Sequence, residues 1–307
     1  MKRLGGFGQF GQTLRRLGAN IKPGRLSPFT IFQEKEKKAE NLLTQCQMND
    51  ASDFFAPELA VVMPVYNEAA NIASVLREWF VCFDKIVPRF VLFTVNDGSK
   101  DETAAILASL SRELGPRLRV VNKKNSGHGS SCREGYELAL AEDAAWVFQI
   151  DSDGQCDPSF FEASYESRAF YDCVFGYRRT RDDGFGRLII SHCYRALLWL
   201  LTGMYMKDPN VPYRLMRAPA LRTALRSIPG DFDLQNIALT VALKREQRLR
   251  WKHFPIHFRA RRGGENSINY RKIVKMGLDF LRDFRRITHE DSHTWWRPRW
   301  ARRRLAS

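Results

Sequence analysis

The sequence predicts an α/β fold with a doubly wound, mostly parallel sheet flanked by helices. Short apolar runs alternate with segments whose apolar residues recur at helical spacing, the pattern of strand–helix–strand units. The chain has 307 residues, 44% of them hydrophobic, which is enough to bury a sizeable core. Polar residues follow each of four predicted strands, and ligands of open α/β sheets bind beyond those strand ends.

The predicted strands are short apolar runs suited to burial on both faces of a sheet. They cover residues 59–63, 90–95, 118–121 and 145–150. Three helices are expected between them. The first carries apolar residues at helical spacing from Ile72 to Phe80, the second carries them from Ile106 to Leu114, and the third begins near Ser130.

The composition along the chain predicts three parts. Residues 1–57 form a basic, flexible N-terminal extension with one predicted helix, and residues 58–268 form the folded domain. Residues 269–307 combine a basic amphipathic helix with a tail rich in Trp and Arg. Between residues 271 and 304 there are 11 Lys or Arg against 4 Asp or Glu, which suits an anionic membrane surface as well as a helix packed on the domain.

The charge and cysteine content narrow the functional classes. The net charge of +15 points to an anionic partner such as nucleic acid, anionic lipid or a phosphorylated substrate. The six cysteines are scattered without a CxxC pair, which favours free thiols in a reducing compartment. No apolar run is long enough to span a bilayer and no secretory signal is recognisable, so we expect a cytoplasmic protein that is soluble or peripheral at a membrane.

An acidic pair directly follows the fourth predicted strand. Asp151 and Asp153 stand one residue apart, and Gln155 offers a further side-chain oxygen. Such oxygen ligands suit Mg²⁺ or Mn²⁺, which often share their coordination with substrate phosphates. An isolated Asp-x-Asp is also common in solvent-exposed turns. The three other polar strand ends favour a metal site here.

Two further acids and a glycine loop follow the other strands. Asp97 is expected to accept hydrogen bonds from a nucleobase, because Asp101 is better placed to cap the next helix. Glu68 is equally consistent with a ligand-binding acid and with a first-turn acid that complements the helix dipole. The loop with Gly127 resembles a phosphate cradle, and His128 is expected to be a loop residue rather than a ligand.

Four segments in this order resemble family 2 of the inverting nucleotide-sugar glycosyltransferases. They read VVMPVYNE, VNDGSKDET, NSGHGSSCREGYELA and DSDGQ. Within that family the sequence is most similar to dolichyl-phosphate mannose synthases and bacterial polyprenyl-phosphate glycosyltransferases, over residues 59–267. The resemblance implies a Rossmann-like GT-A fold for the catalytic domain. It also implies an enzyme that transfers a hexose from a GDP- or UDP-sugar to a polyprenyl or dolichyl phosphate with inversion.

The resemblance further implies roles for individual residues. The donor pocket is expected to contain Pro64, Tyr66, Glu68, Asp97 and Gly127, and the metal is expected to be held by Asp151, Asp153 and Gln155. The segment KDPNVPYRLMRAPAL resembles a family segment that usually reads near D-x-x-S-G-F-R. Val211 and Pro212 replace its Ser-Gly pair, while Asp208 and Arg214 are kept.

The expected acceptor decides which catalytic groups are needed. A phosphate monoester has a second pKa of about 6, so it can attack the anomeric carbon without a protein base. Arg178, Arg187 and Lys207, with Arg214 behind them, are the candidates for holding that phosphate. A sugar hydroxyl acceptor, as in polysaccharide or glycolipid synthesis, would instead need a general base, and Asp231 and Asp233 occupy the region where relatives carry one.

The sequence leaves two other interpretations and predicts one partner. The segment Gln247-Arg-Leu-Arg-Trp251 matches the QxxRW pattern of processive polysaccharide synthases, but we expect the match to be coincidental because a strand-like segment follows it. A basic nucleic-acid-binding protein is an alternative of a different class. It is disfavoured because the strand ends are acidic. Many relatives end in membrane-spanning helices, and no apolar run of this sequence is long enough for one. We therefore expect docking on the membrane or a membrane-anchoring partner subunit to take their place.

Overall fold

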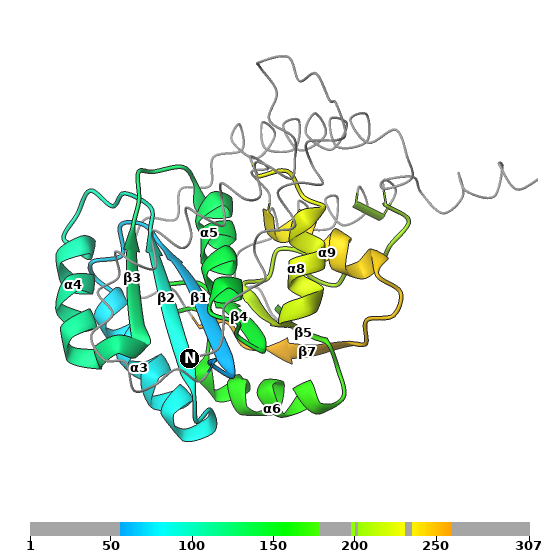
Figure 1. Ribbon diagram of the computed structural model, residues 1–307, viewed down its shortest axis with the longest axis horizontal. Coiled ribbons are helices and arrows are strands. Elements are labelled where there is room, and N and C mark those ends of the chain that lie inside the picture. The colour runs from blue at the N-terminus through cyan, green and yellow to red at the C-terminus, as the bar shows by residue number, and fades with distance from the viewer. Residues whose placement is uncertain (1–55, 179–197, 200–201, 231–234, 260–307) are drawn as a thin grey trace, which may run out of the picture.

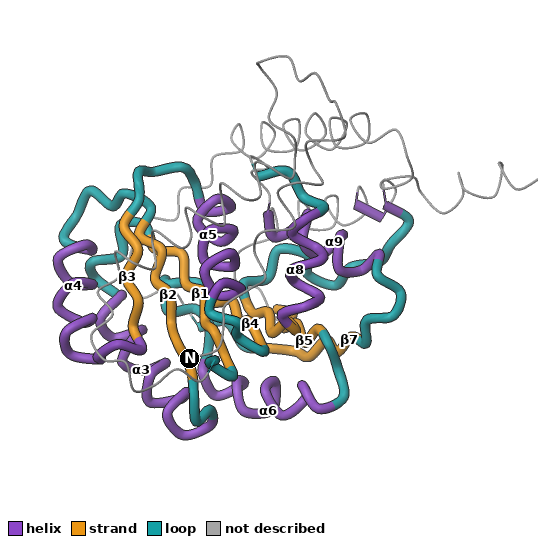
Figure 2. The backbone as a smooth tube through the Cα atoms, viewed as in Figure 1, coloured by secondary structure: helices purple, strands orange, loops and turns teal. Residues whose placement is uncertain are grey.

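The protein was analysed as a computed structural model that describes residues 56–178, 198–199, 202–230 and 235–259. These residues form one seven-stranded sheet with helices on both faces (Figures 1 and 2). The strand order is β3-β2-β1-β4-β6-β5-β7. The predicted α/β class with a mostly parallel sheet is confirmed. The predicted terminal extensions lie outside the described residues, except for residues 56 and 57.

The four predicted strands and three predicted helices are all present. The strands are β1 (Leu59–Val65), β2 (Phe90–Asn96), β3 (Leu118–Asn122) and β4 (Trp146–Ile150). The helices between them are α3 (Ile72–Ile86), α4 (Thr103–Leu114) and α5 (His128–Ala141). Every residue of β1 and β2 is buried, because helices cover both faces of the sheet and apolar side chains are needed on each.

The second half of the described chain completes the sheet. Short helical segments follow β4 at η3 (Pro158–Phe160), α6 (Phe161–Glu166) and η4 (Ser167–Ala169). The remaining elements are β5 (Cys173–Arg178), β6 (Tyr213–Arg217), α8 (Ala218–Arg226), α9 (Gln235–Arg245) and β7 (Trp251–Ile256). The short turn η2 (Gly115–Arg117) leads into β3.

Strand β6 runs antiparallel between two strands that share one direction. It pairs with β4 through Ile150↔Tyr213 and with β5 through Phe175↔Arg214. The start of β6 therefore lies at the same edge of the sheet as the carboxyl end of β4. The loop before β6 thus reaches that edge together with the residues that follow β4.

Alternate residues of β1 pack against opposite layers of helices. Ala60 and Val62 belong to a core cluster shared with α5, α8 and α9. Leu59 and Val61 belong to a second cluster shared with α3, α4 and α6. This division is the period-two side-chain alternation of a strand. It fixes the sheet between two apolar layers and leaves the strand ends for polar chemistry.

Candidate active site at the carboxyl edge of the sheet

A cavity of about 390 Å³ opens at the carboxyl ends of β1, β2 and β4. It is lined by residues that follow each of these strands and by the start of α5. The lining residues are Pro64, Val65, Tyr66, Glu68, Asp97, Asn125, Gly127, His128, Ser131, Asp151, Ser152 and Asp153. The cavity therefore brings together seven of the residues that the sequence analysis selected for donor or metal binding: Pro64, Tyr66, Glu68, Asp97, Gly127, Asp151 and Asp153.

The acidic pair stands in the turn that directly follows β4. Asp153 Oδ1 accepts a hydrogen bond from the Gln155 amide at 3.0 Å, and Gly154 closes the turn with a φ of 75°. Asp151 Oδ1 is buried and has no hydrogen-bond partner among the described residues. Burial raises the pKa of the Asp151 carboxyl, because the charged form is poorly solvated there. A nearby cation would relieve that cost.

Gln155 does not lie where the sequence analysis expected a metal ligand. Its side-chain amide nitrogen donates to the backbone carbonyl oxygen of Arg259 at 3.3 Å, and its backbone carbonyl oxygen accepts from the Arg259 amide at 3.0 Å. The side chain thus joins the acidic turn to the residues after β7, and it is absent from the cavity lining. The structure leaves Asp151 and Asp153 as the metal-binding candidates of the predicted trio.

The site is suited to a cation that takes part of its coordination from a substrate. In the described part of the chain, no group of three or more His, Cys, Asp or Glu side chains is arranged to hold a metal alone. Mg²⁺ and Mn²⁺ are commonly bound by one or two carboxylates plus substrate phosphates. The buried, unsatisfied oxygen of Asp151 and the neighbouring Asp153 fit that pattern.

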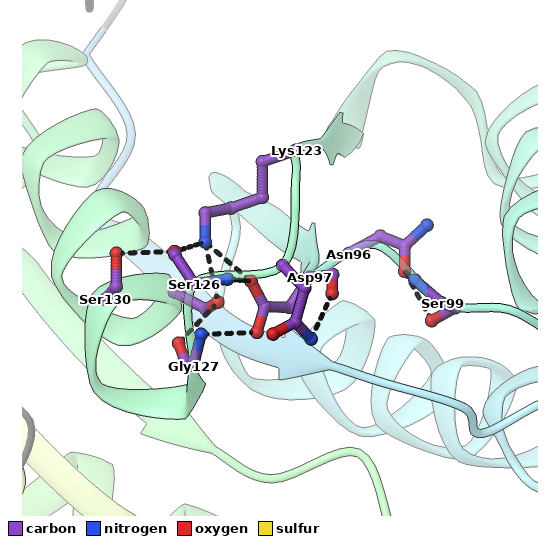
Figure 3. Close-up of polar contacts among 9 residues, drawn as sticks. Asn96, Asp97, Ser99, Lys123, Ser126, Gly127 and Ser130 are labelled. Atoms are coloured by element: carbon purple, nitrogen blue, oxygen red, sulfur yellow. Dashed lines mark hydrogen bonds and ion pairs between the residues drawn. The ribbon is translucent and has the colours of Figure 1, made fainter.

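Asp97 is held by the loop that leads into α5 (Figure 3). Its Oδ1 accepts from Lys123 Nζ at 2.6 Å and from the Ser126 amide at 2.8 Å, and its Oδ2 accepts from the Gly127 amide at 2.8 Å. A carboxylate offers about four acceptor positions, so the chain itself occupies most of them. The sequence predicted Asp97 as a residue of the donor pocket. It did not predict that the carboxylate would accept hydrogen bonds from the loop of residues 123–127.

Opposing effects act on the pKa of Asp97. Burial raises it, but the bonds from Lys123 and from the two backbone amides bring it below its ordinary value. Gly127 adopts a φ of 95°, a conformation that favours glycine. This allows its amide to face the carboxylate. The arrangement holds Asp97 and Gly127 in the cavity lining, with the half-buried Lys123 behind them.

Three other residues, Tyr66, Glu68 and Asp101, follow β1 and β2. Tyr66 lines the cavity and remains 43% exposed, so its ring is available to a ligand. Glu68 is buried, and its Oε2 accepts from the Asn71 side chain at 3.0 Å. Asp101 Oδ1 accepts from the Thr103 amide at 3.1 Å, which agrees with its predicted role at the start of α4.

His128 lines the cavity, although the sequence predicted only a loop residue at this position. It is the first residue of α5 rather than a loop residue, and its Nε2 lies 3.9 Å from Asp151 Oδ1. The signal that could have found it was the helical spacing of His128 and Cys132. Their side chains lie one turn apart and in contact, with Nε2 and Sγ 3.4 Å apart.

The candidates for acceptor binding fall into different environments. Lys207 is exposed, and its Nζ lies 4.5 Å from the centroid of the Tyr177 ring. Arg178 pairs with Asp208 through two contacts, from Nε at 2.8 Å and from Nη2 at 3.1 Å. Arg187, Asp231 and Asp233 lie outside the described residues.

Arg214 is a structural residue rather than a phosphate contact. Its side chain is 0% exposed, and its guanidinium donates to the carbonyl oxygens of Pro209, Val211 and Asn236. The prediction that it takes part in catalysis is therefore corrected, because its guanidinium is used by backbone carbonyls and is absent from the cavity lining. It fixes the loop before β6 instead.

The QxxRW match lies away from the cavity. Trp251 is the first residue of β7, which pairs with β5 in parallel through Cys173↔Trp251. It therefore lies at the amino edge of the sheet, opposite the acidic turn. Arg250 donates to Asp172 there at 3.2 Å. This placement supports the interpretation that the match is coincidental.

Comparison with known proteins identifies relatives of the chain. A family model described as Glycosyl transferase family 2 matches residues 60–226. The undecaprenyl-phosphate 4-deoxy-4-formamido-L-arabinose transferase of Edwardsiella ictaluri (strain 93-146) is 24% identical over 225 residues, which is 73% of this chain and 66% of that protein. The protein of the same name from Sodalis glossinidius (strain morsitans) is 24% identical over 226 residues, 73% of this chain and 67% of that protein. The chain thus spans about two thirds of the length of these relatives.

Solved structures share the fold. Glucosyl-3-phosphoglycerate synthase from Mycobacterium tuberculosis, in complex with Mn²⁺, UDP and phosphoglyceric acid, superposes with a TM-score of 0.55 at 20% identity, covering 85% of this chain and 82% of that one. Mannosyl-3-phosphoglycerate synthase from Rubrobacter xylanophilus gives a TM-score of 0.53 at 15% identity, covering 86% and 80%. The predicted GT-A fold is confirmed. Among the described helices, none is both long and apolar enough to cross a membrane.

Proposed function

The chain belongs to glycosyl transferase family 2, and from this membership we propose that it transfers a hexose from a GDP- or UDP-sugar to a polyprenyl or dolichyl phosphate with inversion. The observation that carries the proposal is the cavity that gathers Tyr66, Asp97, Asp151 and Asp153 at the carboxyl edge of the sheet. Relatives that bear the name of undecaprenyl-phosphate sugar transferases support the acceptor class.

The donor half of the cavity suits a nucleoside diphosphate. Tyr66 offers an exposed ring for the base, and Asp97 Oδ2 accepts one hydrogen bond from the chain, at Gly127. That oxygen is suited to a base that presents an N–H donor. Pro64, Glu68 and Gly127 complete this wall. A Mg²⁺ or Mn²⁺ ion held by Asp151 and Asp153 would neutralise charge on the departing diphosphate.

The acceptor half needs binding and orientation rather than a base. An ionised phosphate is itself the nucleophile, so the chain has to hold it opposite the leaving group. Lys207, Arg178 and Arg187 are proposed for this role. Arg178 is already paired with Asp208, so an incoming phosphate would compete with that carboxylate. A sugar hydroxyl acceptor stays the alternative within the family, and it would require a base from the region of Asp231 and Asp233.

The remaining proposals concern where the enzyme acts. We place it peripherally at the cytosolic face of a membrane, because its acceptor is membrane-bound and its net charge is +15. A membrane-anchoring partner subunit remains part of this proposal. The bounds of the catalytic domain, residues 58–268, and of the two extensions, residues 1–57 and 269–307, are also part of the proposal. Membership of glycosyl transferase family 2 disfavours the alternative of a nucleic-acid-binding protein.

The test is a panel of GDP- and UDP-sugars with Mn²⁺, incubated with the full chain in the presence and absence of polyprenyl phosphate. Lipid-linked sugar is the expected product, with release of the nucleoside diphosphate that depends on the lipid. Product on a sugar hydroxyl acceptor, and none on the lipid phosphate, would establish the alternative instead. Failure to bind any nucleotide-sugar would contradict the proposal as a whole.

A further inference from the structure

We propose that Asn67 and Ser99 are positioning residues for the nucleoside diphosphate of the donor. They join the loop after β1 to the loop after β2, and both loops contribute side chains to the cavity lining. Neither residue lines the cavity itself, so both act through the lining residues beside them. The inference rests on the proposed function, because it presumes a nucleoside diphosphate in this cavity.

Asn67 stands between two residues of the cavity lining, Tyr66 and Glu68. Its backbone has a φ of 52°, a left-handed conformation that costs energy for most residues and that Asn and Asp tolerate best among the non-glycine residues. Its Oδ1 accepts from the Lys100 amide at 2.8 Å, and its own amide donates to Ser99 Oγ at 2.9 Å. Both hydrogen bonds hold the turned backbone against the loop after β2.

Ser99 extends this connection to the ends of two strands. Its hydroxyl donates to Asn96 Oδ1 at 2.6 Å (Figure 3), and the Asn96 side-chain nitrogen donates to Asn122 Oδ1 at 2.8 Å. Asn96 is the last residue of β2 and Asn122 is the last residue of β3. Because the Ser99 hydroxyl donates its hydrogen to Asn96, its oxygen accepts from the Asn67 amide. These side chains therefore link the loop after β1 to the carboxyl ends of β2 and β3.

Two further hydrogen bonds join the same loops nearer the core. The Glu68 amide donates to Thr103 Oγ1 at 2.9 Å, and the Ala69 amide donates to Asp101 Oδ2 at 3.2 Å. Thr103 is 0% exposed, whereas Asn67 is exposed. The bonds at Glu68 and Ala69 remain when Asn67 is substituted, and no apolar core is uncovered. Substitution of Asn67 should therefore change the cavity more than it changes the stability of the protein.

The connected loops hold the cavity in one arrangement before a ligand enters. Tyr66 belongs to the loop after β1 and Asp97 to the loop after β2, and the proposed donor contacts both. Without the connection, only a fraction of the molecules would have both residues in place at one time. The apparent dissociation constant of the donor then rises by the inverse of that fraction. The reaction of the bound donor is unchanged, so KM should respond more than kcat.

The test compares nucleotide affinity with stability. Affinity of the full chain for UDP and, separately, for GDP is measured by calorimetry with Mn²⁺, and stability is measured by urea unfolding. Asn67→Ala is expected to bind the nucleotide that the wild-type chain prefers about fivefold to tenfold more weakly, with little change in the urea midpoint because the side chain is exposed. With the active donor, KM should rise by a similar factor while kcat changes by less than about twofold.

Two further substitutions separate the hydrogen bond from the backbone conformation. Asn67→Asp keeps an acceptor for the Lys100 amide and tolerates the left-handed φ, so its affinity should stay within about twofold of wild type. Asn67→Gly adopts this φ without strain but removes the acceptor, so it should bind as weakly as Asn67→Ala. Equal affinities of the Asp and Gly variants would overturn the role assigned to this hydrogen bond.

Ser99→Ala removes the acceptor of the Asn67 amide and the donor to Asn96, and it should weaken nucleotide binding as Asn67→Ala does. The double variant should lose less than the product of the two single losses, because both residues belong to one connection. Strictly multiplicative losses would overturn the assignment of the two residues to a single connection.

The matched control for stability is Leu221→Ala. Leu221 is 0% exposed in the core cluster beneath α8 and does not line the cavity. Its substitution should lower the urea midpoint more than Asn67→Ala does and should leave the nucleotide affinity of the folded protein unchanged. An equal loss of affinity in Leu221→Ala and Asn67→Ala would mean that general destabilisation explains both, and it would overturn the inference.

The outcomes separate this inference from the function on which it rests. If the wild-type chain binds UDP or GDP and Asn67→Ala binds it equally well, the inference is wrong and the proposed donor class stands. If the wild-type chain binds neither nucleotide, the proposed donor class is wrong and the inference fails with it.

Discussion

At the scale of single residues, the acidic turn after β4 carries the proposed chemistry. Asp153 lines the cavity and takes its position from the turn closed by Gly154. Asp153→Asn keeps the shape of the side chain and removes its charge, so we expect product formation to fall by at least about a hundredfold while the fold is kept. Rates with the active donor and circular dichroism measure the two effects. The control is Asp143→Asn, at an exposed carboxylate outside the cavity lining, and it should retain the wild-type rate. Full activity of Asp153→Asn would contradict the metal assignment.

The ion pair between Asp97 and Lys123 predicts a pH dependence of stability. The folded state lowers the pKa of Asp97, so the carboxylate stabilises the fold above its unfolded pKa of about 4, and this contribution is lost as the pH falls through the lower, folded-state pKa. Asp97→Asn leaves the half-buried Lys123 without its charged partner and should cost about 1–3 kcal/mol of unfolding free energy near neutral pH. Urea unfolding at a series of pH values measures the difference between the two proteins.

That difference should begin to shrink as the pH falls below about 4, because the unfolded wild-type chain then takes up a proton at Asp97 that the folded chain does not. Glu113→Gln, which breaks an exposed pair with Arg77, is the control and should have little effect. A wild-type advantage that stays constant down to pH 3 would contradict the assigned role of Asp97.

The residues of the site were predictable where a strand end fixed their position. Asp97, Asp151 and Asp153 directly follow buried apolar runs, and parallel strands place such residues at one edge of the sheet. Gln155 and Arg214 were not predictable, because their hydrogen bonds reach backbone carbonyls on distant elements. His128 was missed because its four-residue spacing from Cys132 indicates a shared helix face but does not by itself place the side chain beside Asp151.

At the scale of elements, the contact between α5 and β1 positions the glycine loop. Gly135 lies so close to β1 that an added Cβ would come within 2.3 Å of Val62 Cγ1. Gly135→Ala should therefore destabilise the protein by about 1–3 kcal/mol through overpacking, measured by thermal or urea unfolding. The double variant with Val62→Ala removes the clashing methyl groups, so its cost should be smaller than the sum of the two single costs. Strict additivity would show that the close approach is relieved in another way.

Element prediction succeeded best where apolar periodicity was unbroken. The strands at 59–65 and 90–96 extend the predicted runs by one or two residues, because the sequence does not mark where pairing stops. The antiparallel direction of β6 was not predictable from its apolar run. Direction depends on the route of the preceding loop, which the hydrogen bonds of Arg214 fix in three dimensions.

At the scale of the whole molecule, the net charge of +15 predicts electrostatic attraction to an anionic membrane surface. The full chain should co-sediment with vesicles that contain anionic lipid, and less so with neutral phosphatidylcholine vesicles. Raising the ionic strength to about 0.5 M should release much of the bound protein, because screening then acts over only a few ångströms. Equal binding to both kinds of vesicle at low salt would contradict the electrostatic part of the proposed localisation.

The direction of β6 has a consequence for how this architecture diversifies. Because β5 ends and β6 begins at one rim, Arg178 and the loop before β6 lie at the edge of the sheet that also carries the acidic turn. Residues 202–212 can be exchanged without touching β1, β2 and α5, which supply the lining of the cavity together with the acidic turn. On the proposed function, a chimaera that takes this segment from a relative should keep the nucleotide of the recipient and acquire the acceptor preference of that relative.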